Sequence, residues 1–162
     1  MERDAELLEL LEADSRLSHK QLADMLGMQE DQVAERIRVL EEEGAILCYR
    51  TVVNWEKVGR EKVYAFIKVK VMPQRDVGFD AVAERIYRFP EVNSVYLVSG
   101  DYDLAVLVEG ENMKEVAHFV ATKLSTIEGV VSTSTHFVLK AYKQEGVILE
   151  DTEKNKRLVV TP

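Results

Sequence analysis

Four residues between two predicted strands, Gly100-Asp101-Tyr102-Asp103, combine groups that can recognise an amino acid. A glycine lets backbone N–H groups come close to a carboxylate, and an aspartate can pair with an ammonium group. Thr133 and Thr135 lie two residues apart on a later predicted strand, so their hydroxyls point to the same face. These six residues form the candidate effector site. A Gly-Asp turn also suits an ordinary hairpin, so the residues alone leave a structural role open.

A second set of residues could contact DNA. Their side chains are basic or polar and lie in or beside a predicted helix-turn-helix: Lys20, Gln29, Gln32, Arg36, Arg38 and Arg50. Basic side chains that neutralise phosphates supply most of the affinity that does not depend on base sequence.

The element that would position these contacts runs from residue 17 to residue 46. Ser18 can cap a first helix with Gln21 as its capping-box partner, and Gly27 supplies the positive φ of a tight turn. Apolar residues then recur on one face of each of two helices, at Leu22, Ala23 and Leu26 and at Val33, Ile37 and Leu40. A preceding helix with four leucines completes a three-helix unit whose last helix would enter the major groove. Residues 46–53 are rich in β-formers and predict a short strand or wing.

The charge of this unit opposes that interpretation. From Met1 to Ile46 there are 13 acidic and five basic residues, so the whole net charge of −8 lies here and the remainder is neutral. Five acids of the first helix are expected on its solvated face: Glu2, Glu6, Glu9, Glu12 and Asp14. Glu30, Asp31 and Glu35 begin the presumed recognition helix, where they either favour the helix dipole or reflect unusual DNA or a partner.

Composition narrows the class of protein. There is no run of 18 apolar residues and no signal peptide, and the single Cys48 suits a reducing compartment. The three histidines are scattered without metal-ligand spacing, and no Ser, His and Asp set forms a catalytic motif. We therefore expect a cytoplasmic, soluble protein without a cofactor, metal, catalytic residue or membrane contact.

Residues 62–142 predict a ferredoxin-like βαββαβ domain. Apolar residues alternate over 63–71, a helix follows Pro73 and stops at Pro90, and two strands cover 94–98 and 104–108. A second helix over 113–127 and a strand over about 130–142 complete the order, which places both helices on one face of an antiparallel sheet. Apolar Tyr64, Phe66 and Phe137 or Val138 on the other face predict sheet-to-sheet packing between protomers.

The predicted organisation is therefore α+β, with a winged helix-turn-helix over 1–53, a linker over 54–61 and the ferredoxin-like domain over 62–142. The tail over 143–162 is charged apart from the runs 147–149 and 158–160. These runs either add edge strands to the sheet of the same or a neighbouring subunit, or belong to a partly disordered tail.

This combination resembles the Lrp/AsnC family of leucine-responsive and asparagine-responsive transcription regulators. In the first unit the resemblance rests on 22–24, Gly27, 36–38, 40–44 and Ile46. In the second it rests on 90–92, the turn 100–103, 129–130, Thr133, Thr135, 138–139 and the closing 157–162. The resemblance implies a regulator that binds double-stranded DNA and responds to an amino acid or similar molecule between dimers. It assigns residues 62–142 as the effector-sensing and oligomerising domain. It also implies homodimers that assemble into tetramers or octamers.

The chain departs from the family pattern at the recognition helix. Gln29-Glu30-Asp31 stands where many members have Ser-Pro-Ser or Ser-Pro-Thr, and Glu35-Arg36 stands where paired basic residues are frequent. These departures keep open the alternative of a sensor without DNA binding of its own. Because some relatives of the family are siroheme-type tetrapyrrole decarboxylases, an enzyme of that kind is a second alternative.

Overall fold

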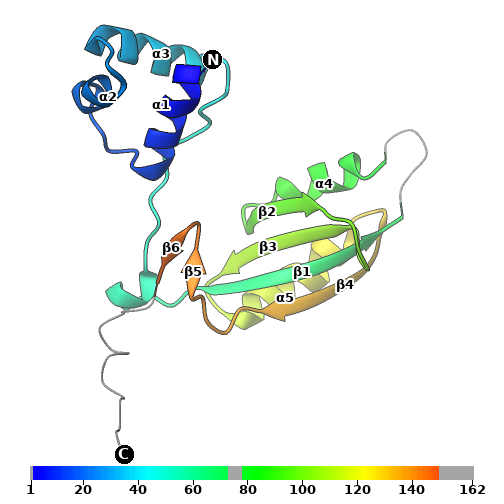
Figure 1. Cartoon of the computed structure of the whole chain (residues 1–162). Helices are drawn as coiled ribbons and strands as arrows, with labels where there is room; N and C mark the ends of the chain where they lie inside the picture. Colours follow the sequence, from blue (N-terminus) through cyan, green and yellow to red (C-terminus); the bar gives the residue numbers. More distant parts are fainter. Residues whose placement is uncertain (1, 73–77, 150–162) are drawn as a thin grey trace, which may run out of the picture. The chain divides into compact units, whose positions relative to one another are not determined.

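The computed structural model describes residues 2–72 and 78–149 (Figure 1). Its contacts divide the chain into two compact units between Val52 and Val53.

The first unit consists of α1 (Glu2–Ala13), α2 (His19–Leu26) and α3 (Glu30–Glu42). The predicted capping box is confirmed: the Gln21 N–H donates to Ser18 Oγ at 3.2 Å, and the Ser18 N–H donates to Gln21 Oε1 at 2.9 Å. Gly27 adopts the left-handed region at φ 61°, as predicted for the turn. Local side-chain chemistry therefore fixes both ends of α2.

One small core holds the three helices together. Its buried members come from the predicted apolar faces: Leu7, Leu11, Leu22, Ala23, Val33, Ile37 and Leu40. Partly buried Leu17, Leu26 and Ile46 pack against this core. The predicted three-helix unit is confirmed.

The strand predicted after α3 is not formed. Residues 47–54 have no regular secondary structure, and the Leu47 side chain is 86% exposed. A strand is stabilised by hydrogen bonds to a neighbour, and among the described strands no partner pairs with this segment. β-Forming composition alone was insufficient here.

The second unit has the predicted ferredoxin-like order. Its main elements are β1 (Val63–Val71), α4 (Asp80–Tyr87), β2 (Val92–Leu97), β3 (Leu104–Gly110), α5 (Met113–Thr122) and β4 (Val130–Phe137). The four strands form an antiparallel sheet in the order β2-β3-β1-β4 (Figure 1). A 3-10 helix, η2 (Leu124–Thr126), lies between α5 and β4.

Alternation along β1 separates the two faces of the sheet. Ala65, Ile67 and Val69 are fully buried in a core that also contains Ile86 of α4 and Phe119 of α5. The intervening side chains therefore lie on the opposite face, which we call the open face. It consists of Tyr64, Phe66, Lys68 and Lys70 with their cross-strand neighbours.

Equivalent turns end both helix segments. The Val92 N–H donates to the Phe89 carbonyl, and the Val130 N–H donates to the Ile127 carbonyl, both at 3.0 Å. In the second turn, Gly129 has φ 96° and its position leaves no room for a side chain. An added Cβ would lie 2.9 Å from a methyl carbon of Val82.

The segments flanking the sheet differ from prediction. The expected linker contains a 3-10 helix, η1 (Trp55–Val58), within the second unit, and β4 ends at Phe137 rather than near 142. The apolar run at 147–149 does not extend the main sheet, because β6 (Val147–Ile148) pairs with β5 (Lys143–Gln144) in a separate two-stranded sheet. The run at 158–160 lies outside the described residues.

Candidate functional site

The first turn of α3 uses two of the predicted DNA contacts for capping. Gln29 is the N-cap residue, and its backbone N–H donates to Gln32 Oε1 at 3.2 Å. Glu30, Asp31 and Gln32 are all exposed at this helix end. The two glutamines therefore have a structural role that the sequence prediction did not include.

Arg38 lies between two carboxylates on the exposed face of α3. Its Nη2 is 2.6 Å from Glu35 Oε1, its Nε donates to Glu35 Oε2 at 3.0 Å, and its Nη1 pairs with Glu42. The hydrogen bonds from Arg38 lower the pKa of the Glu35 carboxyl. The positive charge of Arg38 is thus offset on both sides within the same helix.

Arg36 is paired across the unit rather than along its helix. Its Nε donates to Asp4 Oδ1 of α1 at 2.7 Å, and both side chains are only partly exposed. The hydrogen bond from Arg36 lowers the pKa of Asp4. This contact ties α1 to α3, so Arg36 contributes to the unit's structure in addition to its charge.

The remaining predicted DNA contacts are exposed. Lys20 lies in the first turn of α2, and Arg50 lies in the irregular segment after α3.

The Arg38–Glu42 pair could have been anticipated from its i, i+4 spacing. The Arg36–Asp4 pair spans 32 residues and left no comparable signal.

Hydrogen bonds of Asp103 hold the candidate effector turn against the end of β1. Its Oδ2 accepts a hydrogen bond from the Val71 N–H at 2.8 Å. Its backbone N–H donates to the Val69 carbonyl at 3.0 Å, and its carbonyl accepts from the Val98 N–H at 2.9 Å. One carboxylate oxygen of Asp103 is therefore already engaged by the protein backbone.

The rest of the turn contacts the open face of the sheet. Tyr102 meets Phe66 edge to face, with ring centroids 6.2 Å apart. Lys68 Nζ lies 4.9 Å from the Tyr102 ring centroid and 3.6 Å from Asp101 Oδ2. The Asp101 side chain is 78% exposed. The turn thus presents an accessible carboxylate beside an aromatic ring.

Gly100 is not required by the fold of one protomer. An added Cβ would meet no atom within 4 Å, and its φ lies outside the left-handed region. The absence of a side chain at this position therefore needs an explanation other than packing or backbone strain within the described chain.

Thr133 and Thr135 lie on β4, opposite Val69 and Ile67. They share one face, as predicted, but it is the helix-bearing face, and Thr133 Oγ1 lies 3.2 Å from Ser125 Oγ. Tyr102, by contrast, packs on the open face. The six predicted effector residues therefore form two groups that one protomer does not bring into a single pocket.

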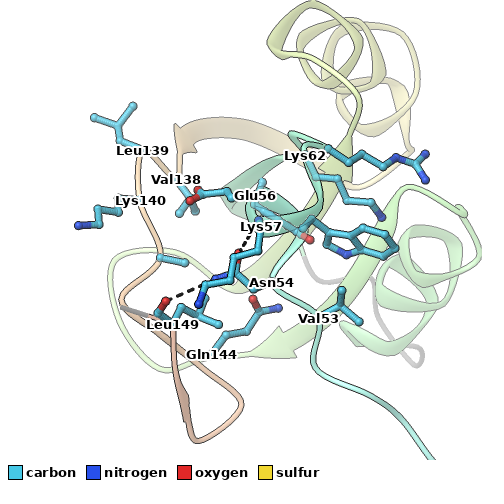
Figure 2. Close-up of a pocket in the computed structure, with 14 residues that line it drawn as sticks. Val53, Asn54, Glu56, Lys57, Lys62, Val138, Leu139, Lys140, Gln144 and Leu149 are labelled. Carbon is cyan, nitrogen blue, oxygen red and sulfur yellow. Dashed lines mark hydrogen bonds between the residues drawn. The ribbon is translucent and has the colours of Figure 1, made fainter. Parts of the chain in front are cut away.

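Sequence reasoning missed a cavity of about 560 Å³ near the start of β1 (Figure 2). Its lining residues are Val53, Asn54, Trp55, Glu56, Lys57, Arg60, Lys62, Tyr64, Val138, Leu139, Lys140, Ala141, Gln144 and Leu149. They come from separate parts of the chain, so no local motif could have indicated the cavity.

The described residues contain neither a metal site nor a membrane-spanning helix. Within 2–72 and 78–149, no three His, Cys, Asp or Glu side chains are arranged to hold a metal ion. Over the same residues, no helix is both long and apolar enough to cross a membrane.

Two family models match the chain. Residues 2–41 match the AsnC-type helix-turn-helix domain, and residues 64–148 match the Lrp/AsnC ligand binding domain. Together these matches include all of α3 except its last residue, and the Gly100–Asp103 turn.

Individual relatives agree with these matches. The chain is 51% identical over 162 residues to the uncharacterized HTH-type transcriptional regulator YugG of Bacillus subtilis, covering 99% of this chain and 98% of that protein. It is 33% identical over 141 residues to the HTH-type transcriptional regulator FL11 of Pyrococcus furiosus, covering 87% and 90%. The regulator NMB0573 of Neisseria meningitidis, solved as its L-Met complex, superimposes with a TM-score of 0.71 at 26% identity, covering 89% and 92%.

The named relatives are transcriptional regulators, so the alternative of a tetrapyrrole decarboxylase is wrong and the protein is not an enzyme. The helix-turn-helix unit and the ligand-binding unit follow each other in the order of the two family models. The chain belongs to the Lrp/AsnC family and is a DNA-binding transcriptional regulator with a ligand-binding domain.

Proposed function

We propose that this regulator binds specific double-stranded DNA sequences through α3 and responds to an amino acid held by the Gly100–Asp103 turn. The observation that carries the effector proposal is Gly100, whose missing side chain is unexplained by the fold and leaves space for close approach of a ligand. The L-Met complex of the Neisseria relative supports an amino acid as the ligand class.

The chemistry of the turn suits a zwitterion. The exposed Asp101 carboxylate can accept hydrogen bonds from an ammonium group, and Asp103 has a second oxygen beyond the one held by the Val71 N–H. Backbone N–H groups next to Gly100 can approach the ligand carboxylate without a side chain in the way.

We further propose that the complete effector site needs two protomers. The turn contacts one face of the sheet, whereas Thr133 and Thr135 lie on the other. A ligand could touch both groups only if the turn comes from one protomer and the threonines from another. Such a site would link effector binding to assembly into tetramers or octamers.

The open face supports a homodimer as the basic unit. Large apolar or aromatic side chains of this face include Tyr64, Phe66, Tyr96 and Leu107, and Tyr96 is 61% exposed. Burial of apolar surface stabilises by about 25 cal/mol per Å² before association costs. Packing two open faces together would cover these residues with an equivalent surface.

DNA binding requires the arginines of α3 to exchange partners. Arg38 is held by Glu35 and Glu42, and Arg36 by Asp4. The Arg38 pairs are exposed and screened by water, so DNA phosphates can replace Glu35 and Glu42 at little cost. The Arg36–Asp4 pair is only partly exposed, so its exchange costs more. The pairing leaves open how strongly this regulator binds a specific sequence, and the following experiment tests that binding.

The test is a fluorescence anisotropy titration of the protein's own promoter duplex, with and without each common amino acid. We expect binding that at least one amino acid changes, and we expect Gly100→Ala to abolish that change while DNA affinity without effector stays the same. Ser99→Ala, at the exposed residue just before the turn, is the matched control. No promoter binding would contradict the proposed sequence-specific contact through α3, and an unaltered response of Gly100→Ala would remove the turn from the effector site.

A further inference from the structure

We propose that the cavity near the start of β1 is a second ligand site, for a small organic carboxylate with an apolar body. Its volume of about 560 Å³ is within the range of small-molecule sites. It includes Lys62 and Tyr64 at the start of β1, whereas the effector turn is fastened to Val71 at the end of that strand. The two ends are separated by roughly 26 Å, at about 3.3 Å per residue.

Hydrogen bonds of Asn54 build part of the wall. Its Oδ1 accepts from the Lys57 N–H at 3.3 Å, which caps η1, and its Nδ2 donates to the Leu149 carbonyl at 3.4 Å. One side chain thus joins η1 to the residue that follows β6 (Figure 2). The cavity is therefore formed by segments that are held to one another.

The lining combines apolar and aromatic surface with positive charge. Val53, Val138 and Leu149 supply aliphatic surface, and Trp55 and Tyr64 supply rings. The cationic members are Lys57, Arg60, Lys62 and Lys140, and among the described residues that line the cavity Glu56 is the sole acid. Figure 2 shows Lys57 near the centre of the labelled group and Lys140 at its edge.

Two of these cations, Arg60 and Lys62, pair with carboxylates that lie outside the lining. Lys62 pairs with Glu109, and Arg60 Nη2 lies 3.1 Å from Glu111 Oε1. The same two cations lie 4.9 and 5.6 Å from the centroid of the Trp55 ring, where cation–π attraction helps to orient the indole. This arrangement presents cations and a ring to the cavity while keeping Glu109 and Glu111 away from it.

These features select the ligand class. A carboxylate gains charge-assisted hydrogen bonds from ammonium or guanidinium groups, and an apolar body is desolvated against the aliphatic and aromatic walls. A zwitterionic amino acid is less suitable, because its ammonium group would lie among four cations with Glu56 as its one acidic neighbour in the lining. The proposed ligand therefore differs in charge from the amino acid proposed for the turn.

Trp55 provides a specific readout, because it is the single tryptophan of the chain. The experiment titrates full-length protein with phenylacetate at constant ionic strength and follows tryptophan emission. We expect a saturable change with a Kd below about 1 mM. Phenylacetamide has nearly the same shape without the charge, and it should bind roughly tenfold more weakly, as expected for loss of a charge-assisted hydrogen bond.

Two variants locate the site. Lys57→Gln should weaken phenylacetate binding about tenfold, whereas Lys114→Gln, an exposed lysine of α5 outside the lining, should leave it unchanged. Gly100→Ala should also leave it unchanged, which separates this site from the proposed amino-acid site. The proposal is overturned by an unsaturable emission signal, by equal binding of phenylacetamide, or by equal effects of the two lysine substitutions.

Discussion

The two units of the chain differ in net charge and in the placement of their cationic side chains. The helix-turn-helix unit is strongly acidic, and Arg16, Arg36 and Arg38 are each paired with carboxylates of the same unit. The second unit is nearly neutral, yet it places four cations around one cavity. Net charge therefore does not identify where an anion binds: the unit that belongs to a DNA-binding family is the more anionic one.

The units also differ in the size of their cores. Among the described residues, seven buried side chains form the core of the first unit and twelve form that of the second, with members from β1, β3, α4 and α5. A unit of about 50 residues is marginally stable by itself. Substitutions in the two cores and in the two charge patterns should therefore have unequal effects.

The largest effect is expected from the core of the first unit. Leu22→Ala removes most of a fully buried side chain and should destabilise by about 2–5 kcal/mol, enough to unfold this unit and abolish DNA binding. Circular dichroism during urea unfolding measures the loss, and Trp55 emission should stay native because it reports on the second unit. Leu47→Ala is the exposed control and should change stability by less than about 0.5 kcal/mol. Simultaneous loss of the native Trp55 signal would show that the units unfold together.

Asp103→Ala should destabilise the second unit by about 1–3 kcal/mol, because the Val71 N–H loses its acceptor. It should also abolish the amino-acid response. Asp103→Asn retains an acceptor oxygen and should recover most of the stability without the charge, so thermal unfolding of the two variants separates the two roles. If Asp103→Ala is as stable as the wild type, the contact with Val71 contributes nothing in solution.

Glu35→Arg tests the charge pattern of α3. The substitution removes one partner of Arg38 and a like charge to phosphate, so binding to unrelated DNA should strengthen more than binding to the native operator. The wild type should show a shallow salt dependence, because each neutralised phosphate contributes a slope of about −0.9 and few cations are available. Titrations of both duplexes at several salt concentrations measure this.

Glu9→Arg, on an exposed position of α1, makes the same change in charge and is the matched control. Equal strengthening by both variants would mean that net charge, rather than release of Arg38, determines the background binding.

The smallest effect concerns acid stability. The pKa of Asp4 is lowered by its hydrogen bond from Arg36, and that of Glu35 by its hydrogen bonds from Arg38. The stability from these carboxylates is complete above their unfolded pKa and is lost as the pH falls through the lower folded values. The free energy of unfolding of the wild type, measured in urea, should fall progressively below about pH 4. Asp4→Asn should flatten this dependence slightly, and an unchanged profile would contradict the role of the Arg36 pair.

Local features of both units followed from the sequence alone. The Ser18–Gln21 capping box, the positive φ of Gly27 and the alternation along β1 depend on neighbouring residues and on the periods of helix and strand. The order of strands and helices then left few possible topologies, and the ferredoxin-like arrangement is one of them. These features could be predicted because each is determined within a few residues.

Contacts between distant segments were decided only by the tertiary structure. The Arg36–Asp4 pair, the Asp103–Val71 hydrogen bond and the cavity beside Trp55 join residues that no spacing relates. Packing also placed Thr133 on the opposite face of the sheet from Tyr102, and it left the β-forming segment after α3 without a partner strand. Local propensity specifies the backbone conformation of a segment, whereas the neighbours of a side chain depend on how the elements fold together.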